Sequence, residues 1–426
     1  MQRVARSVGR SLLSLLAIAI SFAPTAAKAD FIFYQLEALI PMPAAPDNQA
    51  PGGAFTTYDI SFFDGTTQQY YLGDRSNAAV DVFSAATNSF VGRVGGSGGV
   101  FSGIQPSLAA PNNDISGPNG VLVVNQPGQH VLWAGNGDST LKAFNLAAPG
   151  NPQIANIATG TPDQKRVDEM AFSPTTQRLA VANNAAATPF LTLVNTTTNT
   201  IAQKIVFDGT NGTPKATNGI EQAAWSPQAN RFFMSVPEIN GSGAGGVAVI
   251  NPLSGAVEHV FNLTTDFGIS ACSPAGLAVG GSGSIMIGCG VASQSIRLDP
   301  NANNGKGAVT VFPQVSGEDE VWYDPKTHNF LLAARLNPGG PVLGVINDLL
   351  DAWLENLPTT PGDHSVACDP VSGECFVPYG GIAGNGICPN GCIAVFGLVP
   401  EPPALPTMVL GLIVLGGLVR YGRRMG

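Results

Sequence analysis

Short apolar and polar stretches alternate along residues 31–398 in a pattern that repeats. Four segments read almost alike: VDEMAFSPTTQRLAVANN, GIEQAAWSPQANRFFMSV, EDEVWYDPKTHNFLLAAR and DHSVACDPVSGECFVPYG. Each has an acidic residue or a histidine, a short apolar run, a Ser-Pro or Asp-Pro pair and a second apolar run. Proline fits the first central position of a β-turn, and the Ser or Asp before it can bond to the backbone of the turn. Each segment therefore predicts a β-hairpin.

Three diverged copies complete the series: YDISFFDGTTQQYYLG, PNGVLVVNQPGQHVLWAG and PAGLAVGGSGSIMIGC. The residues that begin the seven hairpins are Asp59, Asn119, Asp168, Glu221, Ala275, Asp319 and His364, spaced 44 to 60 residues apart. Two further strand candidates follow most hairpins, and 52 Gly and 33 Pro suit many short strands joined by turns. The sequence predicts an all-β, seven-bladed β-propeller over residues 30–398.

The outer strand pairs carry a resemblance to a known family. A strand, a polar turn and a second strand are predicted in each of three segments: AVDVFSAATNSFVGRV, FLTLVNTTTNTIAQKIVF and GVAVINPLSGAVEHVFNL. They resemble the YVTN/YncE-like repeats of bacterial surface propellers, although the literal Tyr-Val-Thr-Asn is missing. The resemblance implies a propeller that works at the cell surface.

The seventh repeat lacks an outer strand of its own. Its third strand candidate, CIAVFGLV, is followed directly by the C-terminal segment, whereas residues 31–39 (FIFYQLEAL) are a strand candidate left over before the first blade. Pairing the two would close the ring and cover the exposed sheet edges. We therefore expect residues 31–39 to complete blade 7.

The six cysteines fit the same register. Cys272 and Cys289 bracket the blade 5 hairpin, Cys368 and Cys375 flank the blade 7 turn, and Cys388 and Cys392 close the short loop CPNGC. Six cysteines allow 15 pairings, and these three are local and mutually consistent. A zinc site is the alternative, but the spacing matches no standard set of ligand pairs. We expect three structural disulfides.

Both ends of the chain have the features of sorting segments. Residues 1–29 combine three arginines, an apolar run and Ala27-Lys28-Ala29, the order of a secretory signal peptide. Residues 399–426 resemble the PEP-CTERM sorting signal of Gram-negative bacteria, with Pro400-Glu401-Pro402, an apolar membrane segment at about 404–419 and a basic end. That resemblance implies anchoring in the inner membrane, cleavage by an exosortase and delivery to the cell surface or extracellular matrix. A plain C-terminal anchor is the alternative.

The candidate site follows from the propeller register. The first residue of each inner strand should lie near the central channel, which gathers Asp59, Asn119, Asp168, Glu221, Asp319 and His364, with Glu169, Gln222, Glu320 and Ser365 one position on. Oxygens of Asp59, Asp168, Glu221 and Asp319 could hold calcium or another divalent cation, with His364 as ligand or general base. The alternative is that these positions are polar because the channel is wet. Trp133, Trp225 and Trp322 are expected in the blade core.

These features favour some functions over others. A formal net charge of −9 without a Lys/Arg cluster in the body argues against nucleic acid as a partner. We expect a binding or scaffold module in the surface matrix, contacting a polysaccharide or a surface protein, with no certain cofactor. The alternative is a metal-dependent hydrolase of lactonase type, because gluconolactonase-type and other lactonase propellers hold a metal in the channel. A quinoprotein-type redox propeller lacks a cofactor signature here.

Overall fold

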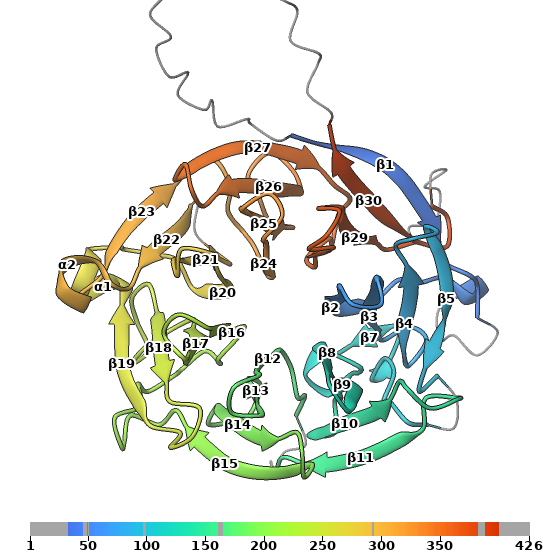
Figure 1. Ribbon diagram of the computed structural model, residues 1–426, viewed down its shortest axis with the longest axis horizontal. Helices are drawn as coiled ribbons and strands as arrows, with labels where there is room; N and C mark the ends of the chain where they lie inside the picture. The colour runs from blue at the N-terminus through green and yellow to red at the C-terminus, as the bar shows by residue number, and fades with distance from the viewer. Residues whose placement is uncertain are drawn as a thin grey trace, which may run out of the picture. The chain divides into compact units, whose positions relative to one another are not determined.

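The computed structural model describes residues 33–45, 49, 51–96, 99–160, 165–291, 294–381 and 388–399. The predicted signal peptide and the predicted membrane segment lie outside these residues. Within them, the chain forms seven four-stranded antiparallel sheets and one short hairpin. Figure 1 shows the seven sheets as blades around a common centre, so the all-β propeller prediction is confirmed.

The blades follow one another along the chain, and in each the first strand is innermost. Blade 1 contains β2 (Tyr58–Asp64), β3 (Gln69–Asp74), β4 (Ala79–Ser84) and β5 (Ser89–Val94). Blade 2 contains β8 (Val121–Gln126), β9 (Gln129–Gly135), β10 (Thr140–Asn145) and β11 (Gln153–Ala158). Blade 3 contains β12 (Met170–Ser173), β13 (Arg178–Asn183), β14 (Phe190–Asn195) and β15 (Thr200–Val206). Blade 4 contains β16 (Ala223–Ser226), β17 (Arg231–Val236), β18 (Gly246–Ile250) and β19 (Val257–Asn262).

The remaining blades repeat the arrangement. Blade 5 contains β20 (Pro274–Val279), β21 (Ile285–Cys289), β22 (Ser295–Asp299) and β23 (Ala308–Phe312). Blade 6 contains β24 (Val321–Asp324), β25 (Asn329–Ala334), β26 (Val342–Asn347) and β27 (Ala352–Pro358). Blade 7 contains β28 (Ala367–Cys368), β29 (Cys375–Tyr379), β30 (Cys392–Leu398) and β1 (Tyr34–Pro41).

Short elements lie in the connections between strands. They are η1 (Pro51–Gly53), the hairpin of β6 (Pro106–Ser107) and β7 (Ala110–Pro111), η2 (Asn113–Ile115), α1 (Leu263–Phe267) and α2 (Ala302–Gly305). Of these, α2 lies within blade 5, between β22 and β23. The hairpin and η2 lie between blades 1 and 2, which explains why the first two repeats are the farthest apart. No helix among the described residues combines the length and the apolar character that crossing a membrane requires.

Blade 7 is built from both ends of the described chain. Strand β1 pairs antiparallel with β30 from Tyr34 opposite Leu398 to Pro41 opposite Cys392, with a bulge between Leu36 and Ala38. Figure 1 shows this blue strand on the outside of the dark red one. The pairing covers the outer edge of β30 and holds the first and last blades in one closed ring.

The inner hairpins turn as the Ser-Pro and Asp-Pro pairs predict. The side chain of Asp324 accepts a hydrogen bond from the backbone N of Lys326 at 2.9 Å, and Ser173 accepts one from Thr176 N at 3.3 Å. A residue at the end of the turn adopts a left-handed conformation, with φ of 58° at His328, directly before β25, and 82° at Gly373, two positions before β29. Asparagine, histidine or glycine tolerates that conformation, and this residue therefore fixes the turn.

The hydrophobic core is divided among the interfaces between blades. The described residues form seven clusters of buried apolar side chains, each shared by two neighbouring blades. Trp133 of blade 2, fully buried, packs with Met170 and Leu179 of blade 3. Burying a large apolar side chain contributes about 1.5–3 kcal/mol, so the interfaces between blades hold the ring together.

The three expected disulfides are present. Sulfur–sulfur distances are 1.97 Å for Cys272–Cys289, 2.14 Å for Cys368–Cys375 and 1.99 Å for Cys388–Cys392. The first two join the strands or flanks of one inner hairpin, and the third closes the loop before β30. All described cysteines are paired, which suits an oxidising environment.

Candidate functional site at the mouth of the central channel

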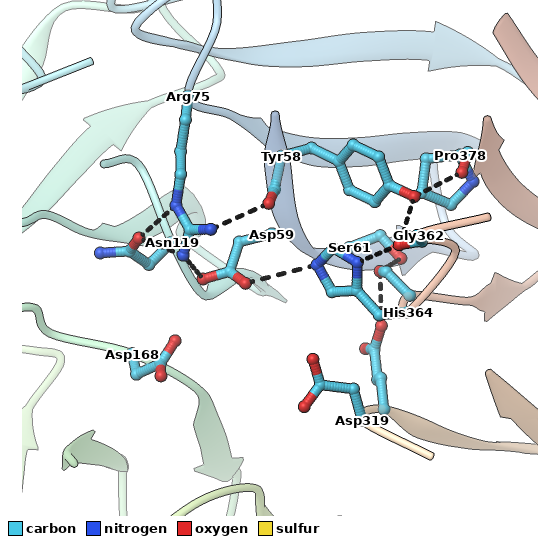
Figure 2. A network of polar contacts seen from close by, with 12 residues as sticks. Tyr58, Asp59, Ser61, Arg75, Asn119, Asp168, Asp319, Gly362, His364 and Pro378 are labelled. Atoms are coloured by element: carbon cyan, nitrogen blue, oxygen red, sulfur yellow. Dashed lines mark hydrogen bonds and ion pairs between the residues drawn. The ribbon is translucent and has the colours of Figure 1, made fainter. Parts of the chain in front are cut away.

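Polar side chains gather where the inner strands begin. Because all seven inner strands run the same way along the axis, their first residues meet at one end, which we call the mouth. The cluster there, called the mouth cluster, consists of Asp59, Arg75, Asn119, Arg166, Asp168, Asn184, Glu221, Asp319, Arg335 and His364. Figure 2 shows part of it. All six polar residues predicted at these positions make polar contacts with another member, and blade 5 contributes only Ala275.

Asp59 and Arg75 form the buried centre of the mouth cluster. A guanidinium nitrogen of Arg75 donates to Asp59 Oδ2. Arg75 also donates to Asn119 Oδ1 from Nε at 3.0 Å and from Nη2 at 2.8 Å, and to the Tyr58 carbonyl at 3.0 Å. Burial by itself raises the pKa of Asp59, but Arg75, then His364 and Arg166, hold it below its usual value. This pair links blade 1 to blade 2.

A second arginine reaches across to blade 3. Arg166 Nη1 lies 3.6 Å from Asp59 Oδ2, and its Nη2 lies 3.1 Å from Asp168 Oδ2. Asn184 donates from Nδ2 to Asp168 at 2.7 Å and to Glu221 at 3.2 Å. Burial raises the pKa of Glu221 to about 7, with Arg166 opposing the rise and Asp319 adding to it. Blades 1, 3 and 4 therefore share one network.

His364 lies at the blade 7 side of the mouth. Its ring stacks on Tyr58 with centroids 4.7 Å apart. The Tyr58 hydroxyl donates to the carbonyl of Pro378 at 2.8 Å, which holds that ring in place. Nδ1 of His364 lies 2.6 Å from the Gly362 carbonyl and Nε2 lies 3.6 Å from Asp59 Oδ1. Both ring nitrogens thus face protein acceptors, and a general-base role for His364 stays a prediction.

Asp319 and Arg335 form the most open ion pair of the mouth. Arg335 Nη1 lies 2.6 Å from Asp319 Oδ2, with side chains 38% and 25% exposed. No group of three or more His, Cys, Asp or Glu side chains in the described part of the chain is close enough to share a metal ion. The four carboxylates predicted as calcium ligands instead have Arg75, Arg166, Asn184 and Arg335 as neighbours. Calcium binding by them stays a prediction.

The repeat pattern predicts the acidic residues of the mouth cluster but not its arginines. Arg75, Asn184 and Arg335 directly follow the second strand of their blades, and in an antiparallel hairpin the end of the second strand lies beside the start of the first. The position after the second strand reads Arg, Asn, Asn and Arg in blades 1, 2, 3 and 6. Aligning that position as well as the first residue of each hairpin would have shown the counter-charges.

A cavity of about 270 Å³ lies beneath the mouth, along the inner strands. We call it the channel cavity. Its polar lining is Ser61, Glu169, Gln222 and Glu320, which are mostly the residues predicted one position on from the mouth. Ser365 Oγ lies 2.6 Å from Glu320 Oε2 and 2.8 Å from Ser61 Oγ. Burial raises the pKa of Glu320 to about 8 and that of Glu169 well above its usual value.

The farther part of the channel cavity is apolar and aromatic. Its lining there includes Phe62, Phe172, Trp225, Trp322 and Tyr323. Trp225 and Trp322 are half-buried and face the cavity at the inner edge of the interfaces between blades, so the expectation that they are core residues holds only in part. Glu169 and Phe172 are three positions apart, which corresponds to about 10 Å along the backbone of a strand.

Comparison with known proteins shows the fold and not a family. No protein-family profile matches the chain, and no curated protein sequence matches it. A hydrazine synthase structure from Kuenenia stuttgartiensis matches 79% of this chain and 94% of its own, with a TM-score of 0.56 and 14% identity. A chain of a mitotic checkpoint complex matches 94% of this chain and 99% of its own, with a TM-score of 0.58 and 10% identity. A streptogramin B lyase structure matches 86% of this chain and 98% of its own, with a TM-score of 0.59 and 9% identity. At such identities these similarities establish a β-propeller, and the site must be interpreted from its own residues.

Proposed function

We propose that this propeller is an exported binding module that uses the mouth cluster to hold a hydroxyl-rich polymer of the surface matrix. The observation that carries the proposal is the exposed pair of Arg335 and Asp319 beside a buried network of further donors and acceptors. A sugar hydroxyl donates one hydrogen bond and accepts others. It therefore fits a surface where guanidinium donors and carboxylate acceptors lie side by side, and the buried network keeps that surface rigid.

Titration calorimetry with three oligosaccharides tests this proposal. We expect residues 30–398 to bind at least one of maltoheptaose, tri-galacturonate and a chitosan oligomer, which are neutral, acidic and basic. The double variant Arg335→Gln with Asp319→Asn should weaken that binding about tenfold or more, since 1.4 kcal/mol corresponds to a factor of ten.

The matched control is the double variant Arg231→Gln with Glu258→Gln. Arg231 Nε lies 2.5 Å from Glu258 Oε2 in blade 4, and this pair is exposed to a similar degree. The control should bind as the unaltered protein does. Absence of binding to all three oligosaccharides, or equal loss in both double variants, would overturn the proposal.

Export and sorting form the second part of the proposed function. The three disulfides and the sequence of residues 1–29 and 399–426 support passage to an oxidising compartment followed by exosortase processing. Expression of the full chain with and without an exosortase tests it. We expect a shorter, released product only in the presence of the enzyme, and a membrane-bound full-length chain in both strains would contradict this.

A metal-dependent hydrolase of lactonase type is the alternative function. It predicts stoichiometric calcium or zinc in purified residues 30–398 and loss of that metal in Asp168→Ala with Asp319→Ala. The binding module predicts neither metal nor lactone hydrolysis. Elemental analysis with and without a chelator, together with a lactone hydrolysis assay, separates the two functions.

A further inference from the structure

The channel cavity contains a buried carboxyl oxygen that nothing in the described part of the chain satisfies. Glu169 is 4% exposed, and its Oε2 makes no hydrogen bond. The other polar side chains of this lining are engaged: Gln222 Oε1 accepts from the backbone N of Leu277 at 2.6 Å, and Glu320 Oε2 accepts from Val366 N at 2.9 Å. A buried acceptor without a partner costs about 1–3 kcal/mol, and a donor from a bound molecule would remove that cost.

The charges around Glu169 favour a positively charged donor. The ionised form of Glu169 is disfavoured by each of four neighbouring carboxyl groups, those of Asp168, Glu221, Asp319 and Glu320. Among the described residues, carboxyl groups outnumber guanidinium groups in the mouth cluster and the channel cavity together. The six carboxyl groups belong to Asp59, Asp168, Glu169, Glu221, Asp319 and Glu320, and the three guanidinium groups to Arg75, Arg166 and Arg335. A cation beside Glu169 would relieve this repulsion, whereas an anion would add to it.

The aromatic side chains favour a ligand with an apolar body. Phe62 of blade 1 and Trp322 of blade 6 lie edge to face with centroids 5.6 Å apart. They can meet across blade 7 because its inner strand β28 has only two residues. The indole N–H of Trp225, in the same lining, also has no hydrogen-bond partner. Aromatic faces attract organic cations and apolar groups alike.

We propose that the channel cavity is a second binding site, distinct from the mouth cluster, for a small organic cation whose ammonium group pairs with Glu169 and whose apolar body lies against Phe62, Phe172, Trp225 and Trp322. The volume of about 270 Å³ lies just below the usual range of ligand cavities, about 300–1,000 Å³. A single ammonium group joined to one ring by a short chain suits a small cavity that has a carboxyl group and several aromatic side chains in its lining.

Three probes with the same body and different heads test the proposal. They are 4-phenylbutylamine, 4-phenylbutanol and 4-phenylbutyrate, titrated into residues 30–398 near neutral pH while tryptophan fluorescence and binding heat are recorded. We expect the amine to bind saturably and about tenfold or more tightly than the alcohol, because a charge-assisted hydrogen bond is roughly twice as strong as a neutral one and about 1.4 kcal/mol corresponds to a factor of ten. The carboxylate should bind most weakly.

Variants locate the site and separate this proposal from the previous one. Glu169→Gln, which keeps the shape of the side chain, should abolish the preference for the amine over the alcohol. Glu258→Gln on the outer strand β19 should leave it unchanged. The double variant Arg335→Gln with Asp319→Asn, which tests the mouth cluster, should still bind the amine.

Each result has a defined meaning. No saturable binding of the amine, an equal preference in Glu169→Gln and the unaltered protein, or tighter binding of the carboxylate would each overturn the proposal. Because the probes contain no sugar, a failure of oligosaccharide binding at the mouth cluster does not affect the test of the channel cavity. A failure of amine binding likewise does not affect the test of the mouth cluster. Circular dichroism tests whether Glu169→Gln keeps the fold. If this variant no longer binds the amine, its binding of 4-phenylbutanol tests whether the cavity is still intact.

Discussion

Replacing Arg75 with methionine should destabilise the propeller more than any exposed ion pair could. The Arg75 side chain is 2% exposed and donates to Asp59, to Asn119 and to the Tyr58 carbonyl. Methionine keeps a long side chain but supplies no donor, so Asp59 loses its closest counter-charge and is left with Arg166 and His364, each 3.6 Å away.

The expected loss is about 3–5 kcal/mol in the free energy of unfolding, because removing one partner leaves a buried charge uncompensated. Adding Asp59→Asn removes that charge. The double variant should therefore be more stable than Arg75→Met alone, with an interaction free energy of about 1–3 kcal/mol. When Arg75 is replaced by methionine, burying a neutral amide at position 59 costs less free energy than burying an unpaired carboxylate.

The pH dependence of this effect has a defined sign. Burial opposes ionisation of Asp59, but Arg75 and its other neighbours lower the pKa of Asp59 in the folded protein. A lowered carboxyl pKa stabilises the fold above the unfolded value of about 4, and this stabilisation is lost as the pH falls below it. The difference between the unaltered protein and Arg75→Met should therefore shrink in acid.

Urea denaturation followed by tryptophan fluorescence and circular dichroism measures all four proteins of the cycle. Arg231→Met is the control, because its partner Glu258 is exposed and such pairs contribute about 0–1 kcal/mol. A loss below about 1 kcal/mol for Arg75→Met, or no recovery on adding Asp59→Asn, would refute the view that the mouth cluster is a buried and mutually dependent network.

Three further outcomes are expected. Cys272→Ser with Cys289→Ser should lower the free energy of unfolding by about 3 kcal/mol, because the bond closes a 17-residue loop; equal stability in non-reducing urea titrations would contradict this. Deleting residues 34–41 uncovers β30 and should cause association in size-exclusion chromatography, whereas an unchanged monomer would refute a role for β1 in closing the ring. Burial raises the pKa of Glu318 to about 8, so its stabilising contribution is present below about pH 4 and is lost as the pH rises to about 8. Between pH 5 and pH 9 the melting temperature should therefore fall less for Glu318→Gln than for the unaltered protein. An equal fall in both proteins would refute this.

The repeats were predictable because the turn chemistry is local. Ser173-Pro174 and Asp324-Pro325 mark a hairpin by sequence alone, and aligning such hairpins gives the number of blades and the cysteine pairs. The same alignment marks the start of each inner strand and therefore predicts the acidic residues of the mouth cluster. These features depend on neighbours within a few residues or on a fixed repeat.

The rest depends on contacts between blades, which no single repeat encodes. Arg166 lies between blades 1 and 3, and a position two residues before Asp168 gives no sign that its side chain reaches Asp59. Trp225 and Trp133 look equivalent as strand tryptophans, yet one lines the channel cavity and the other lies in the core. Whether an inner-strand side chain faces the axis or the next blade is decided by local bulges and packing.

The pairing of β1 with β30 also sets an order of events during folding. Tyr34 and Leu398 are opposite each other although 364 positions separate them along the chain. The first strand to leave a ribosome or a translocation channel therefore has no partner until the last one emerges, and its apolar residues must stay unaggregated while six other blades form. Ring closure is then a late, long-range step, and a chaperone that holds this N-terminal strand would protect the chain until that step.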